Sequence, residues 1–333
     1  MREIHLVARP TGVPTADLFE IVPSAPVELA PGAALVQNVL LSVDPYMRQG
    51  MDSEEWWPLN TPGEGRALGR VLQSLTPVYQ PGDIVFHTQG WRTHAIVTAD
   101  DSRKIDELPG VPLSAHLGIL GGTGLSAYVG LKRILDLQPG ETLFVSAAAG
   151  GVGTAAARIA KLMGAGRVIG STGSDEKAKY LVEEVGLDAA INYRHGALVE
   201  QLAAAAPDGV DAYLDNVGGE HLAAAIDVLN VRGRIAWCGA VSTYNHEAGV
   251  APRNLFDIVG KELRLQGFLV RNHLDLRPEL IDFLTPHLQS GAVVSDETVV
   301  DGLDRMVDAF LAMLGGGNIG KMLVELSDPG LRR

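Results

Sequence analysis

A short glycine-rich turn between an apolar run and an alanine-rich run constrains the fold of this chain more than any other feature. Residues 142–147 (TLFVSA) are apolar, residues 148–153 (AAGGVG) form the turn, and residues 151–165 have the composition of a helix. Further apolar runs, such as residues 167–172 and 209–217, alternate with helix-length segments. Apolar strands that alternate with helices predict a parallel sheet buried on both faces, which is a doubly wound α/β fold.

The two ends of the chain differ in texture from its middle. The first part is rich in proline, glycine and short β-like runs, and the tail combines a strand, a helix, a glycine turn and a last strand. A chain of 333 residues is long enough for two domains. We therefore predict a mostly β domain from residues 1–122 plus 297–333 and a Rossmann domain, the doubly wound type that binds dinucleotides, from residues 123–296.

The balance of charges limits the classes of partner. The chain has 40 Asp and Glu against 27 Lys and Arg, a formal net charge of −13, which does not suit nucleic acid or an anionic membrane. No run approaches the roughly 18 apolar residues of a spanning helix, and the N-terminal residues lack a signal-peptide pattern. We predict a cytoplasmic protein that acts on a small molecule.

Metal chemistry is constrained by the single cysteine, Cys238. One cysteine excludes a four-cysteine zinc site, and the histidines, among them His87 and His221, show no ligand spacing. The sequence also has no nucleophile elbow of the G-x-S-x-G type. We therefore predict chemistry that needs neither a metal ion nor a hydrolytic nucleophile.

The glycine turn is suited to a phosphate group. Backbone N–H groups at a helix N-terminus bind phosphate only where the chain comes close, and small residues allow that approach. Ala148 stands where the G-x-G-x-x-G pattern has its first glycine, so the pattern is incomplete. A tight turn packed for its own sake is the alternative.

The end of the next predicted strand indicates which cofactor the turn would hold. NAD enzymes commonly place Asp or Glu there to bind the ribose 2′-hydroxyl. Here Ser171, Thr172 and Gly173 occupy the position, and Lys177 and Arg194 follow. Hydroxyls, backbone N–H groups and a lysine suit a 2′-phosphate, whereas a carboxylate would repel it. NADP is therefore favoured over NAD, with a solvated surface lysine as the alternative for Lys177.

Longer motifs occur in order along nearly the whole chain. They are LSVDPYMR (41–48), GGTGLSAYVGL (121–131), DNVGG (215–219), CGAVSTYN (238–245) and GNIGK (317–321). Together they resemble the zinc-free branch of the medium-chain dehydrogenase/reductase superfamily that contains the prostaglandin reductases, the alkenal/one oxidoreductases and the bacterial curcumin reductases.

The resemblance implies an activity, a second domain and an assembly. Such proteins reduce the carbon–carbon double bond of α,β-unsaturated ketones and aldehydes with NADPH. Their catalytic domain is a GroES-like β-barrel made from both termini, and many are homodimers. The resemblance also implies a cofactor site. For Asn216 and Asn318, a structural role in turns is the alternative. The residues carried over to this site are Thr123, Gly150, Gly151, Val152, Gly153, Ser174, Lys177, Tyr193, Asn216, Cys238, Gly239, Ala240, Val241, Ser242, Tyr244, Phe268, Leu269, Val270 and Asn318.

Two tyrosines are candidate catalytic residues. Hydride transfer to the β-carbon of an enone moves negative charge onto the carbonyl oxygen, so a hydrogen-bond donor is needed there. Tyr244 is the first candidate, because its loop follows a predicted strand at the edge where this fold binds ligands. Tyr46 of the VDPYMR motif is the second, and the cofactor's own ribose 2′-hydroxyl is a rival donor. Trp56, Trp57 and Trp91 are expected to give the substrate an apolar surface.

Two other functions stay open at this point. One is an NADPH quinone reductase of the same fold, and the other is a cofactor-bound protein without turnover. Comparing NADPH oxidation with enones and with benzoquinones separates the two reductases. Tight cofactor binding without any NADPH oxidation would favour the cofactor-bound protein without turnover.

Overall fold

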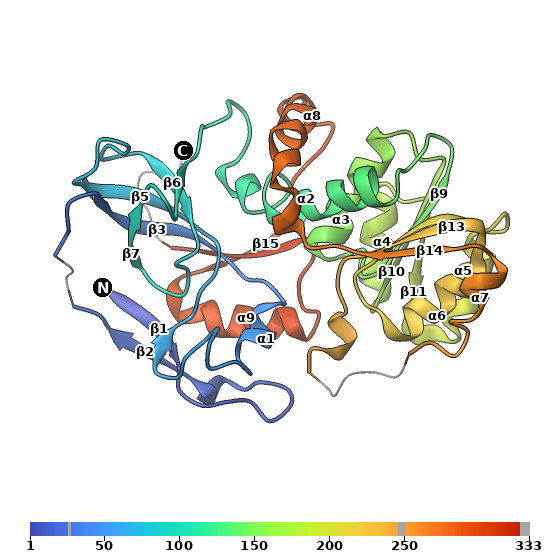
Figure 1. Ribbon diagram of the computed structural model, residues 1–333, viewed down its shortest axis with the longest axis horizontal. Helices are drawn as coiled ribbons and strands as arrows, with labels where there is room; N and C mark the ends of the chain where they lie inside the picture. Colours follow the sequence, from blue (N-terminus) through green and yellow to red (C-terminus); the bar gives the residue numbers. More distant parts are fainter. Residues whose placement is uncertain (26–27, 246–250, 327–333) are drawn as a thin grey trace. The chain divides into compact units, whose positions relative to one another are not determined.

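The computed structural model describes residues 1–25, 28–245 and 251–326 (Figure 1). The chain forms two compact units. Each unit has a hydrophobic core of its own. The first unit consists of Met1–Leu117, Thr298–Gly317 and Met322–Arg333, and the second consists of Gly118–Glu297 and Asn318–Lys321.

Two segments fall in a different unit from the one expected. Gly118–Gly122 and Asn318–Lys321, with the border residue Glu297, belong to the second unit, whereas the sequence-based borders assign them to the first. The physical reason is clear for the later segment. The backbone N–H of Gly320 donates to the carbonyl oxygen of Ala149, at 2.8 Å, and so ties this part of the tail to the glycine turn.

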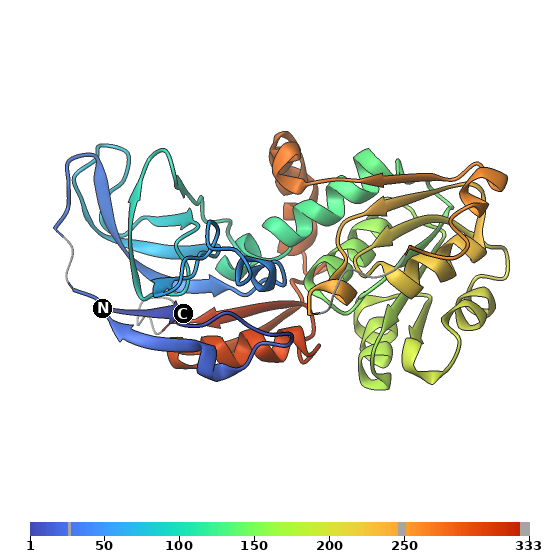
Figure 2. The same cartoon turned by 60° about the horizontal axis from the view of Figure 1, so that its bottom comes forward.

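A six-stranded sheet forms the centre of the second unit. Its strands are β9 (Thr142–Val145), β10 (Arg167–Thr172), β11 (Ala189–Asn192), β12 (Val210–Asp215), β13 (Leu229–Trp237) and β14 (Arg264–Gly267). They lie side by side in the order β11-β10-β9-β12-β13-β14, and the neighbours pair in parallel (Figures 1 and 2). The predicted doubly wound sheet is confirmed. Because β9 and β12 are neighbours with opposite crossover directions, the sheet has its topological switch point there.

Helices cover this sheet. They are α2 (Gly122–Tyr128), α3 (Gly151–Leu162), α4 (Asp175–Tyr180), α5 (Leu198–Ala205), α6 (Gly219–Val228), α7 (Asp257–Gly260) and α8 (Arg277–Gln289). Helix α2 packs against α3, and α5 packs against α6. Beneath α5 and α6, Phe144 stacks on Tyr213 with ring centroids 4.8 Å apart, and both rings are fully buried.

Local sequence explains why α3 and α4 begin where they do. The buried face of α3 consists of small residues such as Ala155, Ala156 and Ala160, which let the helix approach the sheet closely. Ser174 is the N-cap of α4, and its hydroxyl oxygen accepts from the backbone N–H of Lys177 at 3.3 Å. Helix α3 follows β9 after a five-residue turn and α4 follows β10 after two residues, so both helices start at the carboxyl ends of strands, where parallel sheets place their ligands.

The first unit is built from antiparallel strands. One sheet has the order β2-β1-β4, and the other has the order β15-β16-β3-β5-β6-β8, with β7 also paired to β3. Strand β16, from the tail, pairs with β3 and so returns the end of the chain to this unit. The bounds are β1 (Arg2–Leu6), β2 (Phe19–Pro23), β3 (Ala33–Ser42), β4 (Thr61–Pro62), β5 (Ala67–Ser74), β6 (Ile84–His87), β7 (His94–Thr98), β8 (Arg103–Lys104), β15 (Glu297–Asp301) and β16 (Lys321–Glu325), with the helices α1 (Met47–Gly50) and α9 (Met306–Leu314).

Two of the three tryptophans expected at the substrate are core residues instead. Trp91 is fully buried and Trp57 is 3% exposed. Their rings pack edge to face, with centroids 5.0 Å apart, and Phe310 of α9 packs against Trp91. Trp56, in contrast, is 43% exposed. Of the three, only Trp56 therefore stays a candidate for a substrate surface. The sequence gives no sign of which aromatic residues fill the core.

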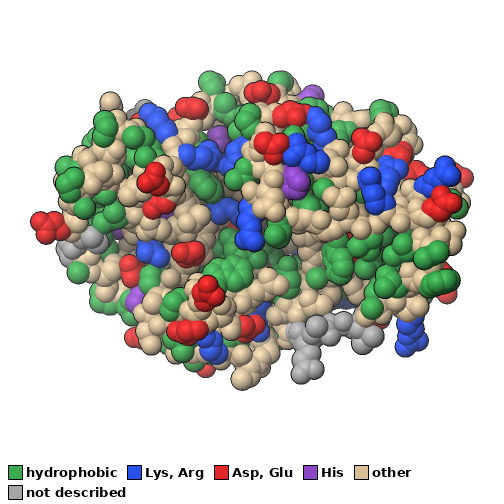
Figure 3. All heavy atoms as spheres, in the orientation of Figure 1, with side chains coloured by type: hydrophobic (Ala, Val, Ile, Leu, Met, Phe, Trp, Pro, Cys, Tyr) green, Lys and Arg blue, Asp and Glu red, His purple; other side chains and the backbone are tan. Residues whose placement is uncertain are grey.

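The surface carries both signs of charge. On the face shown in Figure 3, acidic and basic side chains are interspersed. Among the residues that the structure describes, no helix is both long and apolar enough to cross a membrane.

Candidate cofactor and active site

The turn between β9 and α3 brings backbone close to backbone. Ala147 has a positive φ of +48°, so the chain changes direction directly after β9. A Cβ atom on Gly153 would lie 2.5 Å from the Cα of Ala148, closer than real Cβ atoms come to other atoms. Gly150 is the N-cap of α3 and brings no side chain to the first turn. The N-terminal N–H groups of α3 therefore suit an anion such as a pyrophosphate.

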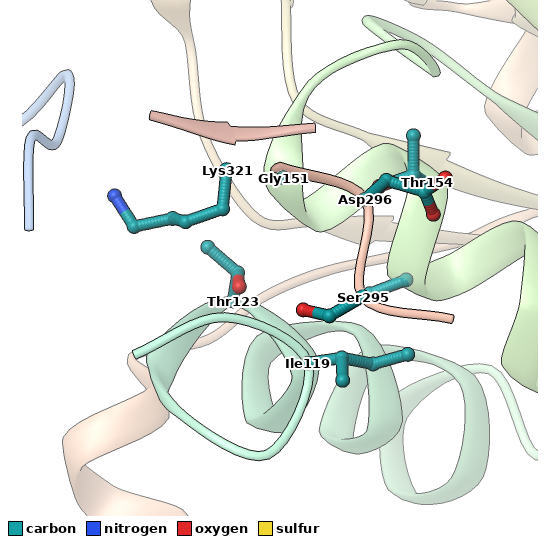
Figure 4. Close-up of a pocket in the computed structure, with 8 residues that line it drawn as sticks. Ile119, Thr123, Gly151, Thr154, Ser295, Asp296 and Lys321 are labelled. Carbon is teal, nitrogen blue, oxygen red and sulfur yellow. The ribbon is translucent and has the colours of Figure 1, made fainter. Parts of the chain in front are cut away.

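Segments from three parts of the chain meet at this turn. Gly320 donates its backbone N–H to the carbonyl oxygen of Ala149, and the Cγ2 atom of Thr123 lies 3.1 Å from where Gly151 would carry a Cβ. Figure 4 shows Thr123, Gly151 and Lys321 around the start of α3. The pocket that they line has an empty volume of about 170 Å³. Part of this volume is open to solvent, so the pocket is far too small to hold a whole dinucleotide.

Asp296 fixes another wall of the pocket. Arg158 of α3 donates from Nε to Oδ2 of Asp296, at 2.7 Å, and from Nη2 to Oδ1, at 2.8 Å. The hydroxyl of Tyr180 also donates to Oδ1, at 2.5 Å. The backbone carbonyl of Asp296 accepts from the N–H of Lys321 at 2.8 Å. Sequence reasoning missed this network, because nothing in the sequence pairs residues so far apart.

The end of β10 carries cationic groups near a tyrosine. Tyr193 reaches over Gly173, since a Cβ on that glycine would lie 2.8 Å from the tyrosine hydroxyl oxygen. The guanidinium carbon of Arg194 lies 5.9 Å from the centre of the Tyr193 ring. Burial lowers the pKa of Lys177, the charge of Glu176 opposes this shift, and the charge of Arg194 adds to it. Two cations close enough to repel each other favour the binding of an anion here.

The DNVGG motif is tied together by Asp215 at the end of β12. One carboxylate oxygen accepts from the Tyr213 hydroxyl at 2.7 Å, the Ser146 hydroxyl at 3.1 Å and the N–H of Gly218 at 2.8 Å. The amide nitrogen of Asn216 donates to the carbonyl oxygen of Ser146 at 2.8 Å. The structure therefore gives Asn216 the turn role that was left as its alternative. Its role toward a cofactor stays a prediction.

The loop after β13 folds back onto this motif. The N–H of Cys238 donates to the carbonyl oxygen of Asp215 at 2.8 Å, and the N–H of Val241 donates to that of Asn216 at 3.1 Å. Burial raises the pKa of Cys238 to about 12, so this thiol stays protonated and is a poor nucleophile. The other predicted residues of the loop are Gly239, Ala240, Ser242 and Tyr244.

Tyr244 turns its hydroxyl toward its own loop. The hydroxyl oxygen lies 3.6 Å from where Gly239 would carry a Cβ. Burial raises the pKa of Tyr244, whereas a backbone hydrogen bond at Ala240 opposes the shift. The hydroxyl therefore stays protonated at neutral pH and is able to donate a hydrogen bond.

The remaining predicted residues of this unit lie in two places. The Nδ2 of Asn318 donates to the carbonyl oxygen of Gly320 at 2.7 Å, which puts Asn318 in the segment tied to the glycine turn. Phe268 lies after β14, where its ring packs edge to face with His273 at a centroid distance of 6.4 Å. Leu269, its neighbour, is 54% exposed. Val270 follows at the start of a short 3-10 helix.

Tyr46 belongs to the first unit and lies in an aromatic and ionic cluster there. Its ring stacks on Trp56, with centroids 6.0 Å apart and planes within 8°. The guanidinium carbon of Arg66 lies 5.3 Å from the Tyr46 ring centre, and Arg66 pairs with Asp44 at 3.4 Å. Burial raises the pKa of Tyr46, and the charge of Asp44 adds to the effect. This hydroxyl is therefore also a protonated donor.

No group of three or more His, Cys, Asp or Glu side chains that could hold a metal ion is found in the described part of the chain. The sequence-based expectation of metal-independent chemistry is not tested by this observation.

Two family models match the chain. The model described as "N-terminal domain of oxidoreductase" matches residues 2–105, and the one described as "Zinc-binding dehydrogenase" matches residues 151–285. The two matches fall on the β-rich start of the chain and on the parallel sheet.

Relatives match along most of their length. Prostaglandin reductase 1 of Bos taurus is 40% identical over 94% of this chain and 95% of its own, and the NADP⁺-dependent 2-alkenal reductase of Nicotiana tabacum is 38% identical over 88% and 87%. The crystal structure of CurA from Vibrio vulnificus in complex with NADPH has a TM-score of 0.91, with 33% identity over 99% of this chain and 100% of that one. These matches agree with the geometry of the glycine turn, the DNVGG motif and the end of β10. The chain belongs to the medium-chain dehydrogenase/reductase family, in the branch that contains prostaglandin reductase 1 and the 2-alkenal reductases.

Proposed function

We propose that this protein reduces the carbon–carbon double bond of α,β-unsaturated ketones and aldehydes with NADPH. The names of the bovine and tobacco relatives support the reaction, and the Vibrio neighbour supports the cofactor. One observation carries the chemistry in this chain. The hydroxyl of Tyr244, a protonated donor at neutral pH, belongs to the loop after β13, at the carboxyl ends of the parallel strands, where the glycine turn also lies.

The residues present fit NADPH at both of its phosphate positions. The start of α3 presents backbone N–H groups where a side chain on Gly153 would collide with Ala148. At the end of β10, Lys177 and Arg194 supply positive charge and no acidic residue ends the strand. We therefore assign the pyrophosphate to the turn and the 2′-phosphate to the region of Lys177, Arg194 and Tyr193.

NADPH supplies a hydride when it is bound. The task of the chain is then to bind the enone and to stabilise the charge that develops on its carbonyl oxygen. Tyr244 donates a hydrogen bond to that oxygen, and the α-carbon takes its proton from the same hydroxyl or from water. Tyr46 is the second candidate for the donor, and the cofactor's ribose 2′-hydroxyl is the third.

The test compares substrates and cofactors on the purified protein. We expect NADPH oxidation with trans-2-alkenals and enones, a saturated carbonyl product, and little oxidation of NADH. Faster turnover with benzoquinones than with any enone would favour a quinone reductase instead. Tight NADPH binding without oxidation across both panels would favour a binding protein and overturn the proposal.

We also propose that the reaction is zinc-independent and that the protein is cytoplasmic. The single cysteine supports both proposals, because it cannot supply a four-cysteine zinc site and because a chain without an internal disulfide suits a reducing compartment. Metal analysis of active protein, followed by an assay in the presence of a chelator, tests the zinc proposal. Full loss of activity with the chelator would contradict it.

We further propose a homodimer formed through β14. This strand lies at the edge of the six-stranded sheet, and most of its residues are exposed. An exposed edge strand readily pairs with another strand. Phe256, which is 80% exposed, and Val259, which is 67% exposed, add apolar surface on the nearby α7 segment. Light scattering should give twice the mass of one chain for the parent protein and the mass of a single chain for Leu265→Pro.

A further inference from the structure

His221 is a buried histidine that the proposed mechanism does not use. It lies in the first turn of α6 and is 7% exposed. Its Nε2 atom is buried and has no hydrogen-bond partner among the described residues. Burial lowers the pKa of His221 to about 4, so the ring is neutral at pH 7. A buried polar atom without a partner is costly, and such groups need an explanation.

The ring of His221 lies against Tyr193. The two ring centroids are 5.1 Å apart and the planes meet at 77°, which is an edge-to-face contact. The opposite ends of this contact come from different strands, since Tyr193 follows β11 and His221 follows β12. In the sheet, β10 and β9 lie between β11 and β12. The contact therefore bridges the carboxyl ends of β10 and β9, where we place the cofactor.

Tyr193 needs such a support. It begins a 3-10 turn of three residues, Tyr193–His195, and 39% of its surface is exposed. Its hydroxyl nevertheless reaches over Gly173, at 2.8 Å from where that residue would carry a Cβ. An exposed tyrosine on a short turn has several rotamers available, and contact with a buried ring restricts them.

We infer that His221 is a positioning residue for the adenosine end of the cofactor. It holds Tyr193 over Gly173, beside the cations Lys177 and Arg194, so that the tyrosine hydroxyl meets the 2′-phosphate. His221 thereby strengthens the preference for a 2′-phosphorylated nucleotide without touching the reacting atoms. This inference rests on the proposed NADPH site.

Calorimetry with two fragments of the cofactor tests it. The probes are 2′,5′-ADP and 5′-AMP, which differ only in the 2′-phosphate. In His221→Ala we expect 2′,5′-ADP to bind about three- to tenfold more weakly, the range for one lost aromatic contact, with 5′-AMP nearly unchanged. His221→Phe keeps a ring against Tyr193 and should keep most of the affinity for 2′,5′-ADP.

His287→Ala is the matched control. His287 also packs edge to face with an aromatic ring, that of Phe283, at a centroid distance of 6.0 Å, but on α8. Its removal should leave both affinities unchanged. If His221→Ala does not fold, His221→Leu fills the space without a ring and should show the same loss.

A double-mutant cycle with Tyr193→Phe shows whether His221 acts through the tyrosine. The effect of His221→Ala should be much smaller when the Tyr193 hydroxyl is already absent. Fully additive effects, or an unchanged 2′,5′-ADP affinity in a folded His221→Ala protein, overturn the inference. If the parent protein itself does not distinguish the two probes, the proposed NADPH function fails instead.

Discussion

Arg158 and Asp296 form a two-point ion pair across 138 residues of sequence, with nitrogen–oxygen distances of 2.7 and 2.8 Å. Their side chains are only 9% and 1% exposed. The pair joins α3 to the segment whose backbone also holds Lys321. It therefore connects the helix that follows the glycine turn to the part of the tail that flanks this turn.

Arg158→Met should destabilise the fold strongly. Removing one partner leaves a buried carboxylate without its cation, which typically costs about 3–5 kcal/mol in the free energy of unfolding. Urea unfolding measures the loss. Arg232→Met is the control, because Arg232 and Glu262 form an exposed pair with side chains 79% and 62% accessible. An exposed pair contributes about 0–1 kcal/mol. Equal losses in the two variants would contradict the prediction.

Gly153→Ala should weaken both folding and NADPH binding. The added Cβ would lie 2.5 Å from the Cα of Ala148, so the turn must move. Overpacking of this kind costs roughly 1–3 kcal/mol. Thermal unfolding and NADPH titration measure the two effects. Gly260→Ala is the control, since a Cβ there meets nothing within 4 Å. A Gly153→Ala protein with unchanged NADPH affinity would show that the turn does not approach the cofactor.

Lys177→Met should raise the KM for NADPH about tenfold or more and leave that for NADH nearly unchanged. The reason is the loss of one charge-assisted hydrogen bond to the 2′-phosphate, worth about 1.5–3 kcal/mol. Steady-state kinetics with both cofactors gives the answer. Lys179→Met removes a lysine whose side chain is 70% exposed on the same helix and should change neither value. Parallel increases for NADPH and NADH would assign Lys177 a structural role.

Tyr244→Phe should lower kcat on an enone by about ten- to a thousandfold, because one hydrogen-bond donor to the developing oxyanion is lost. The KM for NADPH should change little. Since burial raises the pKa of Tyr244, its ionisation should not reduce kcat below about pH 10. Tyr46→Phe is the comparison. If only Tyr46→Phe slows turnover, the donor is Tyr46, and if neither does, the cofactor's ribose hydroxyl is favoured.

Acid should destabilise the protein between about pH 6.5 and pH 4. Burial lowers the pKa of His87 and of His221 from 6.5 to about 4, so the unfolded chain binds protons more readily than the folded one in this window. The free energy of unfolding therefore falls as the pH falls, by on the order of 3 kcal/mol per histidine. Urea unfolding at a series of pH values measures the slope. His87→Gln should flatten it, and an unchanged slope would exclude His87 as a cause.

The sequence predicts the parallel sheet well, because buried parallel strands are continuous apolar runs, and Ser174 gives a local signal for the start of α4. Local sequence also places the glycine turn after β9 and shows that no acidic residue ends β10. These local signals do not predict which residues far apart in the sequence come into contact. Arg158 and Asp296, or Tyr193 and His221, are separated by whole elements, and only the folded sheet edge brings them together. Asn216 was predicted from its motif alone, which cannot distinguish a side chain that faces a ligand from one that bonds to Ser146.

Gly320 has a φ of +66°, and a Cβ there would lie 2.8 Å from the Cβ of Asp296 while its N–H reaches Ala149. The glycine turn is thus completed by a segment that the ribosome makes about 170 residues later. The parallel sheet emerges complete before this glycine does. A nascent chain therefore has to reach residue 320 before the glycine turn gains this backbone hydrogen bond.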